Sequence, residues 1–269
     1  MKKAGIILAC TVGTYFWGPG NALAWSNPFN PNPTQEDATI VRTSTTACPS
    51  DPNAEPADYT VWVYEHAPYF GRCKVLLPGF YPGSANFGIP NDSMSSIKIG
   101  AGVRVRLFEH SVYGGAYTVV TSDESYLGNI ISWNDVVSSM RVELADRSRY
   151  CSDVREGEMA LFVDANYNPL NDCVVLPVKT WNGLPRTYSN PAAMGIRNDS
   201  ISSIKYRSDF NRTGFFWDVN LNNNSAACYT AYPHQDIPSL PSRYGIIIGP
   251  NDQISSIGPV ANQYVCGRF

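Results

Sequence analysis

Short runs in which apolar and polar residues alternate are the main structural signal in this chain. Residues 103–107 alternate valine or leucine with arginine, and residues 96–99 and 139–142 alternate in the same way. A period of two is typical of a β-strand with one buried face. Residues 159–163 are apolar without a break, which predicts a strand buried on both faces. Clusters of glycine, proline and asparagine separate these runs, so the pattern predicts an all-β protein.

Two of these strands begin within a six-residue pattern that occurs four times. The pattern is Asn-Asp-x-x-Ser-Ser, with a bulky apolar residue at its fourth position and another directly after the second serine. The copies are residues 91–96, 134–139, 198–203 and 251–256. Asn and Asp favour turns because their side chains bond the nearby backbone. The pattern also supplies oxygen atoms, which hard cations such as calcium prefer as ligands.

A second, aromatic pattern lies upstream of each copy. Residues 64–71 and 108–115 fit aromatic-x4-Tyr-x-Gly in full. The third unit has Pro169 where the glycine is expected, and the fourth has Leu221 and Asn223 at the tyrosine and glycine positions. The leading aromatic lies 27 and 26 residues before the Asn-Asp pair in the first two units, and 36 and 35 residues before it in the last two. The four units therefore form two pairs, and a repeat this regular dictates the architecture.

This pairing predicts two domains. We expect domain 1 over residues 58–147, a polar linker over 148–156 and domain 2 over 157–262. Residues 25–57 are rich in Asn, Pro, Thr and Ser and contain few large apolar residues. Because such a segment buries little, the composition predicts a flexible leader.

The first 24 residues resemble an export signal. Lys2 and Lys3 precede a largely apolar stretch, and the small residues around Leu23 predict cleavage after Ala24. A membrane anchor is the alternative, but the stretch is too short to span a bilayer, and a lipoprotein site at Cys10 has a very short apolar segment before it. We therefore expect a secreted or periplasmic protein without a membrane span. The net charge of −3 and the lack of a basic cluster argue against nucleic acid as a partner.

Six cysteines remain once the signal is removed, and an even number in an exported chain predicts disulfides. Six cysteines allow 15 connectivities. Two pairs occupy similar places around the leading aromatics of the first and third units. We therefore expect the bonds Cys48–Cys73 and Cys151–Cys173, which leaves Cys228–Cys266. No Cys-x2-Cys spacing indicates a cysteine metal site.

The two recurring patterns, in order and at regular spacing, resemble those of a two-domain microbial βγ-crystallin. The resemblance covers roughly residues 58–260. It implies two Greek-key β-sandwich domains, each built from two motifs. Pro169, Leu221 and Asn223 depart from the aromatic pattern of the family.

The resemblance also implies calcium sites that the two motifs of a domain share. One loop gives backbone oxygens at its aspartate and the next residue, and the partner loop gives the hydroxyl of its first serine. The carbonyl directly after the leading aromatic completes the set. Because few ligands are carboxylates, the affinity for Ca2+ is expected to be micromolar or weaker. The implied ligand residues are Glu65, Asp92, Ser93, Ser95, Glu109, Asp135, Val136, Ser138, Val163, Asp199, Ser200, Ser202, Trp217, Asp252, Gln253 and Ser255.

The function implied is that of a calcium-binding structural or stress-protective protein and not of an enzyme. No nucleophile elbow, zinc-protease helix, phosphate loop or dinucleotide fingerprint is found. His66 and His110 occupy equivalent repeat positions, which indicates a structural role, and His234 has no nucleophile context. A distant carboxylate pair acting on a glycan would not show in a sequence. The alternatives are an inhibitor of extracellular (metallo)peptidases and a glycan-binding module, so an unknown extracellular protein or polysaccharide partner stays open.

Overall fold

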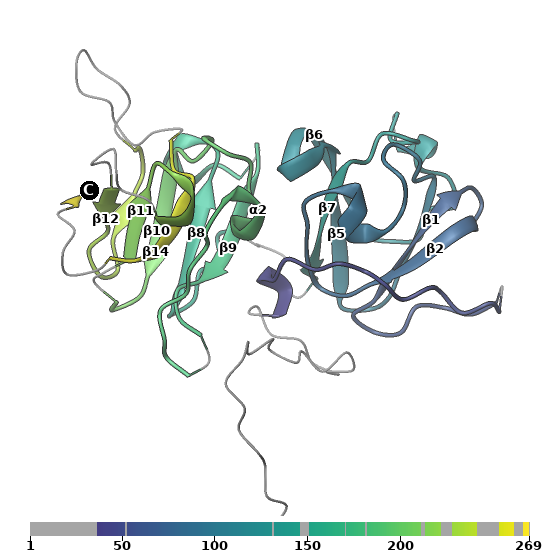
Figure 1. Ribbon diagram of the computed structural model, residues 1–269, viewed down its shortest axis with the longest axis horizontal. Coiled ribbons are helices and arrows are strands. Elements are labelled where there is room, and N and C mark those ends of the chain that lie inside the picture. Colours follow the sequence, from purple (N-terminus) through teal and green to yellow (C-terminus); the bar gives the residue numbers. More distant parts are fainter. Residues whose placement is uncertain are drawn as a thin grey trace, which may run out of the picture.

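A computed structural model describes residues 37–51, 53–130, 132–145, 151–169, 171–180, 182–210, 213–221, 228–240, 253–260 and 266–268. The predicted export signal and the first part of the leader lie outside these residues. The described strands form two groups that lie side by side (Figure 1). We call the group β1 to β7 domain 1 and the group β8 to β15 domain 2.

Domain 1 contains two antiparallel sheets. One has the strand order β2-β1-β4 and the other has the order β3-β7-β5-β6. The helical segments are all a single short turn. The elements are η1 (Asp37–Thr39), β1 (Val61–His66), β2 (Phe70–Leu76), β3 (Gly79–Tyr81), α1 (Ser84–Phe87), β4 (Ser96–Ile99), β5 (Val103–His110), η2 (Ser111–Tyr113), β6 (Gly114–Val120), η3 (Leu127–Asn129) and β7 (Ser139–Leu144).

Domain 2 repeats this plan with shorter strands. Its sheets have the orders β13-β10-β8-β9 and β14-β11-β12-β15, and β15 alone pairs in parallel among the described strands of this domain. The elements are β8 (Glu158–Phe162), η4 (Ala165–Tyr167), β9 (Cys173–Pro177), α2 (Pro191–Met194), β10 (Ser203–Arg207), β11 (Thr213–Phe216), η5 (Val219–Leu221), β12 (Cys228–Thr230), β13 (Asp236–Ile237), β14 (Ser256–Pro259) and β15 (Gly267–Arg268).

The motifs of each domain exchange a strand, which makes the fold a Greek key. β3 follows β2 in sequence but pairs with β7 in the other sheet, and Glu124 forms the reciprocal bridge to Ile97. In domain 2, β13 pairs with β10, and Tyr188 bridges to Ile257. The fold class predicted from the sequence, all-β with two Greek-key β-sandwich domains, is confirmed.

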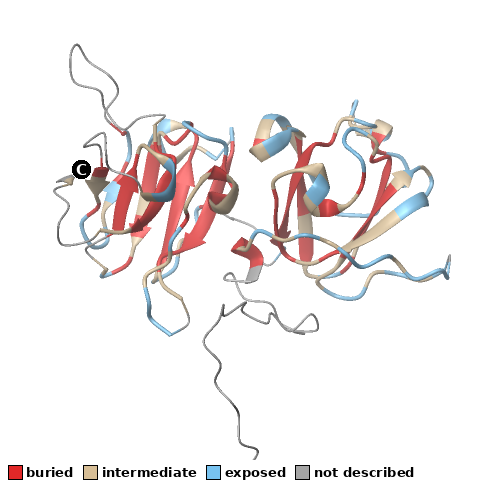
Figure 2. Ribbon diagram, in the orientation of Figure 1, coloured by how far each residue is buried: buried red, intermediate tan, exposed pale blue. Residues whose placement is uncertain are grey.

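The predicted strands are confirmed, and their apolar positions form the cores (Figure 2). Every residue of β8 is buried, as expected for an uninterrupted apolar run. The bulky residues directly after the second serines, Ile97, Met140, Ile204 and Ile257, are at most 1% exposed. Burying a side chain of this size contributes about 1.5–3 kcal/mol to folding, so the repeat also fixes four core positions.

All three predicted disulfides are present. The bonded pairs are Cys48–Cys73, Cys151–Cys173 and Cys228–Cys266. The first two join a residue that precedes the domain to its second strand, β2 or β9, and the third lies within domain 2. A loop of a few tens of residues gains about 3 kcal/mol from the restricted unfolded state.

Residues 37–57 differ from the predicted leader, because they pack against domain 1. Ala38 is buried, the backbone N–H of Arg42 donates to Phe80 O at 2.9 Å, and Cys48 is bonded to β2. Farther along, Lys98 Nζ donates to Ala54 O at 3.0 Å. Backbone hydrogen bonds and the disulfide hold this segment against domain 1. Neither interaction requires large apolar side chains, so the low apolar content did not reveal them.

Candidate metal-binding loops

The Asn-Asp pair forms the same turn in each of the three copies that the structure describes. The asparagine Nδ2 donates to the neighbouring aspartate Oδ2 at 2.6 Å in the first two copies and at 2.7 Å in the third. The three aspartates, Asp92, Asp135 and Asp199, have φ angles of 51°, 54° and 49°. Among residues with side chains, Asn and Asp adopt this left-handed conformation most readily, which explains their place in the pattern. Asn251 and the predicted ligand Asp252 lie outside the described residues.

The first serine of each copy is held beside the leading aromatic of its own motif. Its backbone N–H donates to the carbonyl of that aromatic in all four copies, at 2.8–3.0 Å. The residue after the aromatic therefore lies next to the serine, and its carbonyl is the predicted ligand. The four bonds are Ser95 to Tyr64, Ser138 to Phe108, Ser202 to Phe162 and Ser255 to Phe216.

The serine hydroxyls reach across to the partner loop of the same domain. Ser95 Oγ lies 2.9 Å from Asp135 Oδ1 and also 2.9 Å from the carbonyl oxygen of Glu65. Ser138 Oγ donates to Asp92 Oδ1 at 3.0 Å, which is the reciprocal contact. In domain 2, Ser255 Oγ donates to Asp199 Oδ1 at 3.1 Å. The structure thus brings together a hydroxyl, a carboxylate and, in the first site, a carbonyl from three separate segments.

Other predicted ligands offer only their backbone oxygens. Ser93 Oγ and Ser200 Oγ each donate to a carbonyl of their own loop at 2.8 Å, so their side chains point away from the shared site. Glu65 Oε2 and Glu109 Oε2 accept from backbone N–H groups of their hairpins at 3.3 and 3.2 Å. Both glutamates therefore keep their carboxylates in the hairpin.

For the remaining predicted ligands, the structure describes burial and backbone contacts. Val163 follows Phe162 and is buried, and its N–H donates to Asp172 O at 3.1 Å. Trp217 follows Phe216 and is partly buried. Val136 and Gln253 are partly buried in their loops, and Ser202 is anchored through its backbone.

The second serine has a role that the sequence pattern alone did not reveal. Its hydroxyl donates to one carbonyl of the aromatic hairpin and accepts from one N–H of that hairpin. Ser139 Oγ donates to His110 O at 2.6 Å and accepts from Tyr113 N at 3.0 Å. The same pair of bonds occurs at Ser96, Ser203 and Ser256. Its recurrence directly after the first serine, in every copy that follows an aromatic pattern, was the available signal.

We call this pair of bonds from the second serine to the hairpin the serine lock. It preserves the hairpin where the aromatic pattern departs from that of the family. Tyr167 and Leu221, the residues that bond the second serine in domain 2, have φ angles of 59° and 56°, close to 61° at Tyr113. Pro169 and Leu221 therefore do not alter the turn. His66 and His110 serve the lock through their carbonyl oxygens, which supports the structural role predicted for them.

The donor set suits a hard cation. Within the described parts of the chain, no group of three or more His, Cys, Asp or Glu side chains could hold a metal ion. The converging atoms are instead hydroxyl, carbonyl and single carboxylate oxygens, which calcium accepts and which soft metals do not prefer. The residues of the first site, Glu65, Ser95 and Asp135, thus fit calcium.

Comparison with known proteins finds similarity to single domains of solved structures. A βγ-crystallin domain from Flavobacterium johnsoniae is 37% identical, over 32% of this chain and 94% of that chain, with a TM-score of 0.30. A βγ-crystallin domain from Clostridium beijerinckii is 34% identical, over 31% and 97%, with a TM-score of 0.29. The N-terminal domain of protein S is 30% identical, over 32% and 97%, with a TM-score of 0.30.

No protein-family model matches the chain, and no curated protein matches it. The assignment therefore rests on identity across nearly the whole of these domains, together with the fourfold repeat and the exchanged strands. On these grounds the chain belongs to the βγ-crystallin family.

Proposed function

We propose that this protein binds calcium at loops shared between the two motifs of each domain and acts as a secreted structural or stress-protective protein. The observation that carries the proposal is the convergence of Ser95 Oγ, Asp135 Oδ1 and the Glu65 carbonyl within hydrogen-bonding distance. The reciprocal contacts at Ser138 and Ser255 repeat this arrangement.

The residues would act on calcium through preformed geometry. The aspartate of each described turn adopts the left-handed conformation, and the first serine is anchored to the aromatic strand through its backbone N–H. The hydroxyls of Ser95, Ser138 and Ser255 lie beside a carboxylate of the partner loop. Calcium accepts six to eight oxygen ligands at about 2.3–2.6 Å, including carbonyls and water. With one carboxylate in each described contact, we expect micromolar or weaker affinity.

Binding would stabilise the folded chain by linkage. Calcium that binds the assembled loops and not the unfolded chain adds RT ln(1 + [Ca]/Kd), which is about 2.7 kcal/mol per site at one hundred times Kd. Because each site takes groups from two motifs, the ion would hold those motifs together. This property suits a structural role and requires no catalytic group.

The disulfides support a location outside the cytoplasm. Three disulfide bonds persist in oxidising surroundings, in agreement with the export signal inferred from the first 24 residues. None of the helices within the described residues has the length and apolar character needed to cross a bilayer.

The test is a calorimetric titration of calcium into chelator-treated protein, residues 25–269, combined with thermal melts. We expect saturable heat and a higher melting temperature. Replacing both cross-loop serines of domain 1, Ser95→Ala with Ser138→Ala, should abolish binding in that domain. Ser93→Ala is the matched control, because its side chain bonds its own loop. Absence of heat and of any shift in melting temperature would refute calcium binding and would favour the peptidase-inhibitor or glycan-binding alternatives.

A further inference from the structure

A buried cluster of charged residues joins the two domains. Arg106 of β5 and Arg141 of β7 lie directly opposite each other in the sheet of domain 1, and Glu143 lies opposite Arg104. Like charges at opposed strand positions repel, and here Arg141 is fully buried and Arg106 is 6% exposed. Glu143 accepts from Arg104 Nε at 2.9 Å and from Arg106 Nε at 3.3 Å. Arg141 Nε lies 3.5 Å from Glu143 Oε1, so one carboxylate pairs with three guanidinium groups within domain 1.

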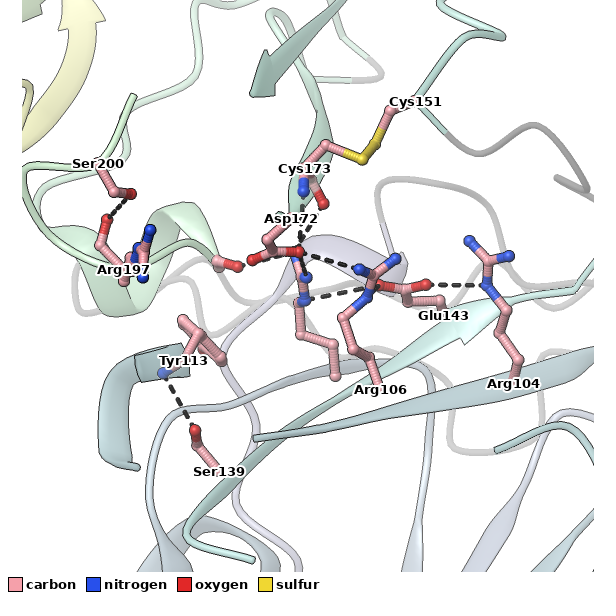
Figure 3. A network of polar contacts seen from close by, with 12 residues as sticks. Arg104, Arg106, Tyr113, Ser139, Glu143, Cys151, Asp172, Cys173, Arg197 and Ser200 are labelled. Atoms are coloured by element: carbon pink, nitrogen blue, oxygen red, sulfur yellow. Dashed lines mark hydrogen bonds and ion pairs between the residues drawn. A yellow bond between two sulfur atoms is a disulfide. The ribbon is translucent and has the colours of Figure 1, made fainter. Parts of the chain in front are cut away.

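Domain 2 supplies the second anion. Asp172 Oδ1 accepts from Arg106 Nη1 at 3.1 Å (Figure 3). It also accepts from Arg141 Nη2. Asp172 is 3% exposed, and the next residue, Cys173, is fixed by its disulfide to Cys151. Arg141 Nη1 also donates to the carbonyls of Cys173 and Gly195, each at 3.0 Å. Charge balance in the buried sheet of domain 1 therefore depends on domain 2.

On the domain 1 side, this cluster is next to a calcium loop. Arg141 lies two residues after Ser139, whose hydroxyl locks the hairpin at Tyr113 (Figure 3). Ser138, the neighbouring residue, donates to Asp92 of the partner loop. The Tyr113 hydroxyl crosses to domain 2 and donates to Ala192 O at 3.1 Å.

On the domain 2 side, the same cluster is bonded to predicted calcium ligands. The carbonyl of Asp172 accepts from the N–H of Val163, whose own carbonyl is a predicted ligand. Gly195 follows α2 and leads through Arg197 into the loop of Asp199, and Ser200 Oγ donates to Arg197 O at 2.8 Å (Figure 3). A Cβ at Gly195 would lie 2.4 Å from the Phe80 ring of domain 1, so the two surfaces are in close contact.

We propose that calcium binding in domain 1 and calcium binding in domain 2 are energetically coupled through Asp172, Arg141 and Tyr113. This inference rests on the proposed function. The cross-domain bonds form only when residues 172–173 and 192–195 adopt their observed positions. The same residues position the Val163 carbonyl, through Asp172, and the Asp199 loop, through Gly195. An ion that orders the loops of one domain therefore lowers the cost of ordering the loops of the other, and the coupling is positive.

The coupling is tested by adding calcium chloride to isotopically labelled protein and following backbone amide NMR signals. The amides of Asp92 and Asp135 report domain 1, and the amide of Ser255 reports domain 2. Asp199→Ala removes the carboxylate that Ser255 Oγ contacts in domain 2, and we expect the domain 1 titration midpoint to rise by about fivefold or more. Linkage is reciprocal, so Asp92→Ala should raise the domain 2 midpoint by the same factor.

The Asp172→Asn variant tests whether the charged cluster carries the effect. In this background, Asp199→Ala should leave the domain 1 midpoint unchanged while both domains still bind calcium. Asp209→Asn is the matched control, since Asp209 pairs with Lys179 on the surface of the same domain. In that background, Asp199→Ala should still raise the domain 1 midpoint by the wild-type factor. If Asp172→Asn does not fold, Tyr113→Phe removes only the hydroxyl bonded to Ala192 and should reduce the factor.

The outcomes separate the two proposals. Calcium-dependent signals in both domains that do not respond to each other's ligand mutations overturn the coupling and leave calcium binding intact. A full coupling factor in Asp172→Asn, or in Tyr113→Phe where that variant is used, likewise overturns the assigned route. Wild-type protein with no calcium-dependent signal in either domain overturns the proposed function itself.

Discussion

The two domains share their turns but differ at the strand positions that follow. Two and four residues after the second serine, β7 of domain 1 carries Arg141 and Glu143, and β10 of domain 2 carries Lys205 and Arg207. In domain 1 these side chains are at most 1% exposed, and Arg141 bonds Asp172 of the other domain. In domain 2, Arg207 pairs with Asp236, and the two side chains are 31% and 38% exposed.

The difference separates two kinds of position in the repeat: those that build the loop and those that differ between the domains. The Asn-Asp turn, the backbone bond of the first serine and the two hydroxyl bonds of the second serine recur in every described copy, so these positions build the loop itself. The outward strand positions are free to differ, and they determine whether a sheet faces water or another domain. The following experiments test this division, from the largest expected effect to the smallest.

Glu143→Gln should destabilise the protein far more than Asp236→Asn, which removes the anion of the Arg207 pair in domain 2. It leaves three arginines beside one another in a buried site, and removing one partner of a buried ion pair costs about 3–5 kcal/mol. Asp236→Asn breaks a partly exposed pair, which costs about 1 kcal/mol or less. Urea unfolding of both variants measures the difference. Equal losses would contradict the contrast between the two sheets.

Acid should weaken the same cluster in the wild-type protein. Burial alone would raise the pKa of Glu143, but Arg106, Arg141 and Arg104 outweigh burial and hold the pKa below its usual range. A carboxyl with a depressed pKa contributes stability that is fully present above the unfolded value of about 4.3 and is lost as the pH falls through the folded value. Melting temperatures between pH 7 and pH 3 should therefore fall more steeply below about pH 5 for wild type than for Glu143→Gln. Parallel curves would argue against this role for Glu143.

Alanine in place of the second serine should be costly in both domains. Ser139 and Ser203 are fully buried, and each substitution leaves one N–H and one carbonyl of the hairpin without the hydroxyl, at about 1–3 kcal/mol. Because the lock is the same in hairpins with and without the glycine, Ser139→Ala and Ser203→Ala should give similar losses in thermal or urea unfolding. A loss confined to one domain would mean that the other hairpin is held by different contacts.

Replacing the hairpin glycine of domain 1 should destabilise the protein, although the hairpins of domain 2 form without that glycine. At Gly115, φ is +74°, and a Cβ would lie 2.9 Å from the Glu109 Cβ. Gly115→Ala should cost about 1–2 kcal/mol from the left-handed conformation, plus the close contact. Gly157→Ala is the control, since its φ is +83° and nothing lies within 4 Å of a Cβ there. Unfolding midpoints that drop equally would show that the close contact adds nothing.

Much of the fold and of the candidate site could be predicted from the sequence because both depend on short-range signals. The strands followed from alternation within residues 96–107 and 139–142, and the disulfides followed from comparing equivalent units. The left-handed turns, Asp92 among them, lie where the pattern places its aspartates.

The cluster between the domains could not be predicted because its members look like surface residues. In residues 103–107 the arginines occupy the polar face, which alternation alone assigns to water. Arg106 is nevertheless buried, and its partner Asp172 lies 66 positions away in the other domain. Nothing in the local pattern reveals which polar face meets a second domain. The packing of residues 37–57 could not be predicted either. Most of its hydrogen bonds use backbone groups, and every residue type carries those.

The exchanged strands also set the order in which this chain becomes stable during its synthesis. β3 leaves the ribosome long before β7. Residues 40–42 bond one edge of β3 at Phe80, but the other edge, where Tyr81 pairs with Met140, has β7 as its strand neighbour. The first motif therefore emerges with an unpaired edge that waits for the second motif, and each domain becomes complete only when its last strand is released. Pairing between such distant segments is slow. A pause in translation between the two motifs of a domain would thus expose this edge to neighbouring chains, whereas a pause between the domains would follow a completed sandwich.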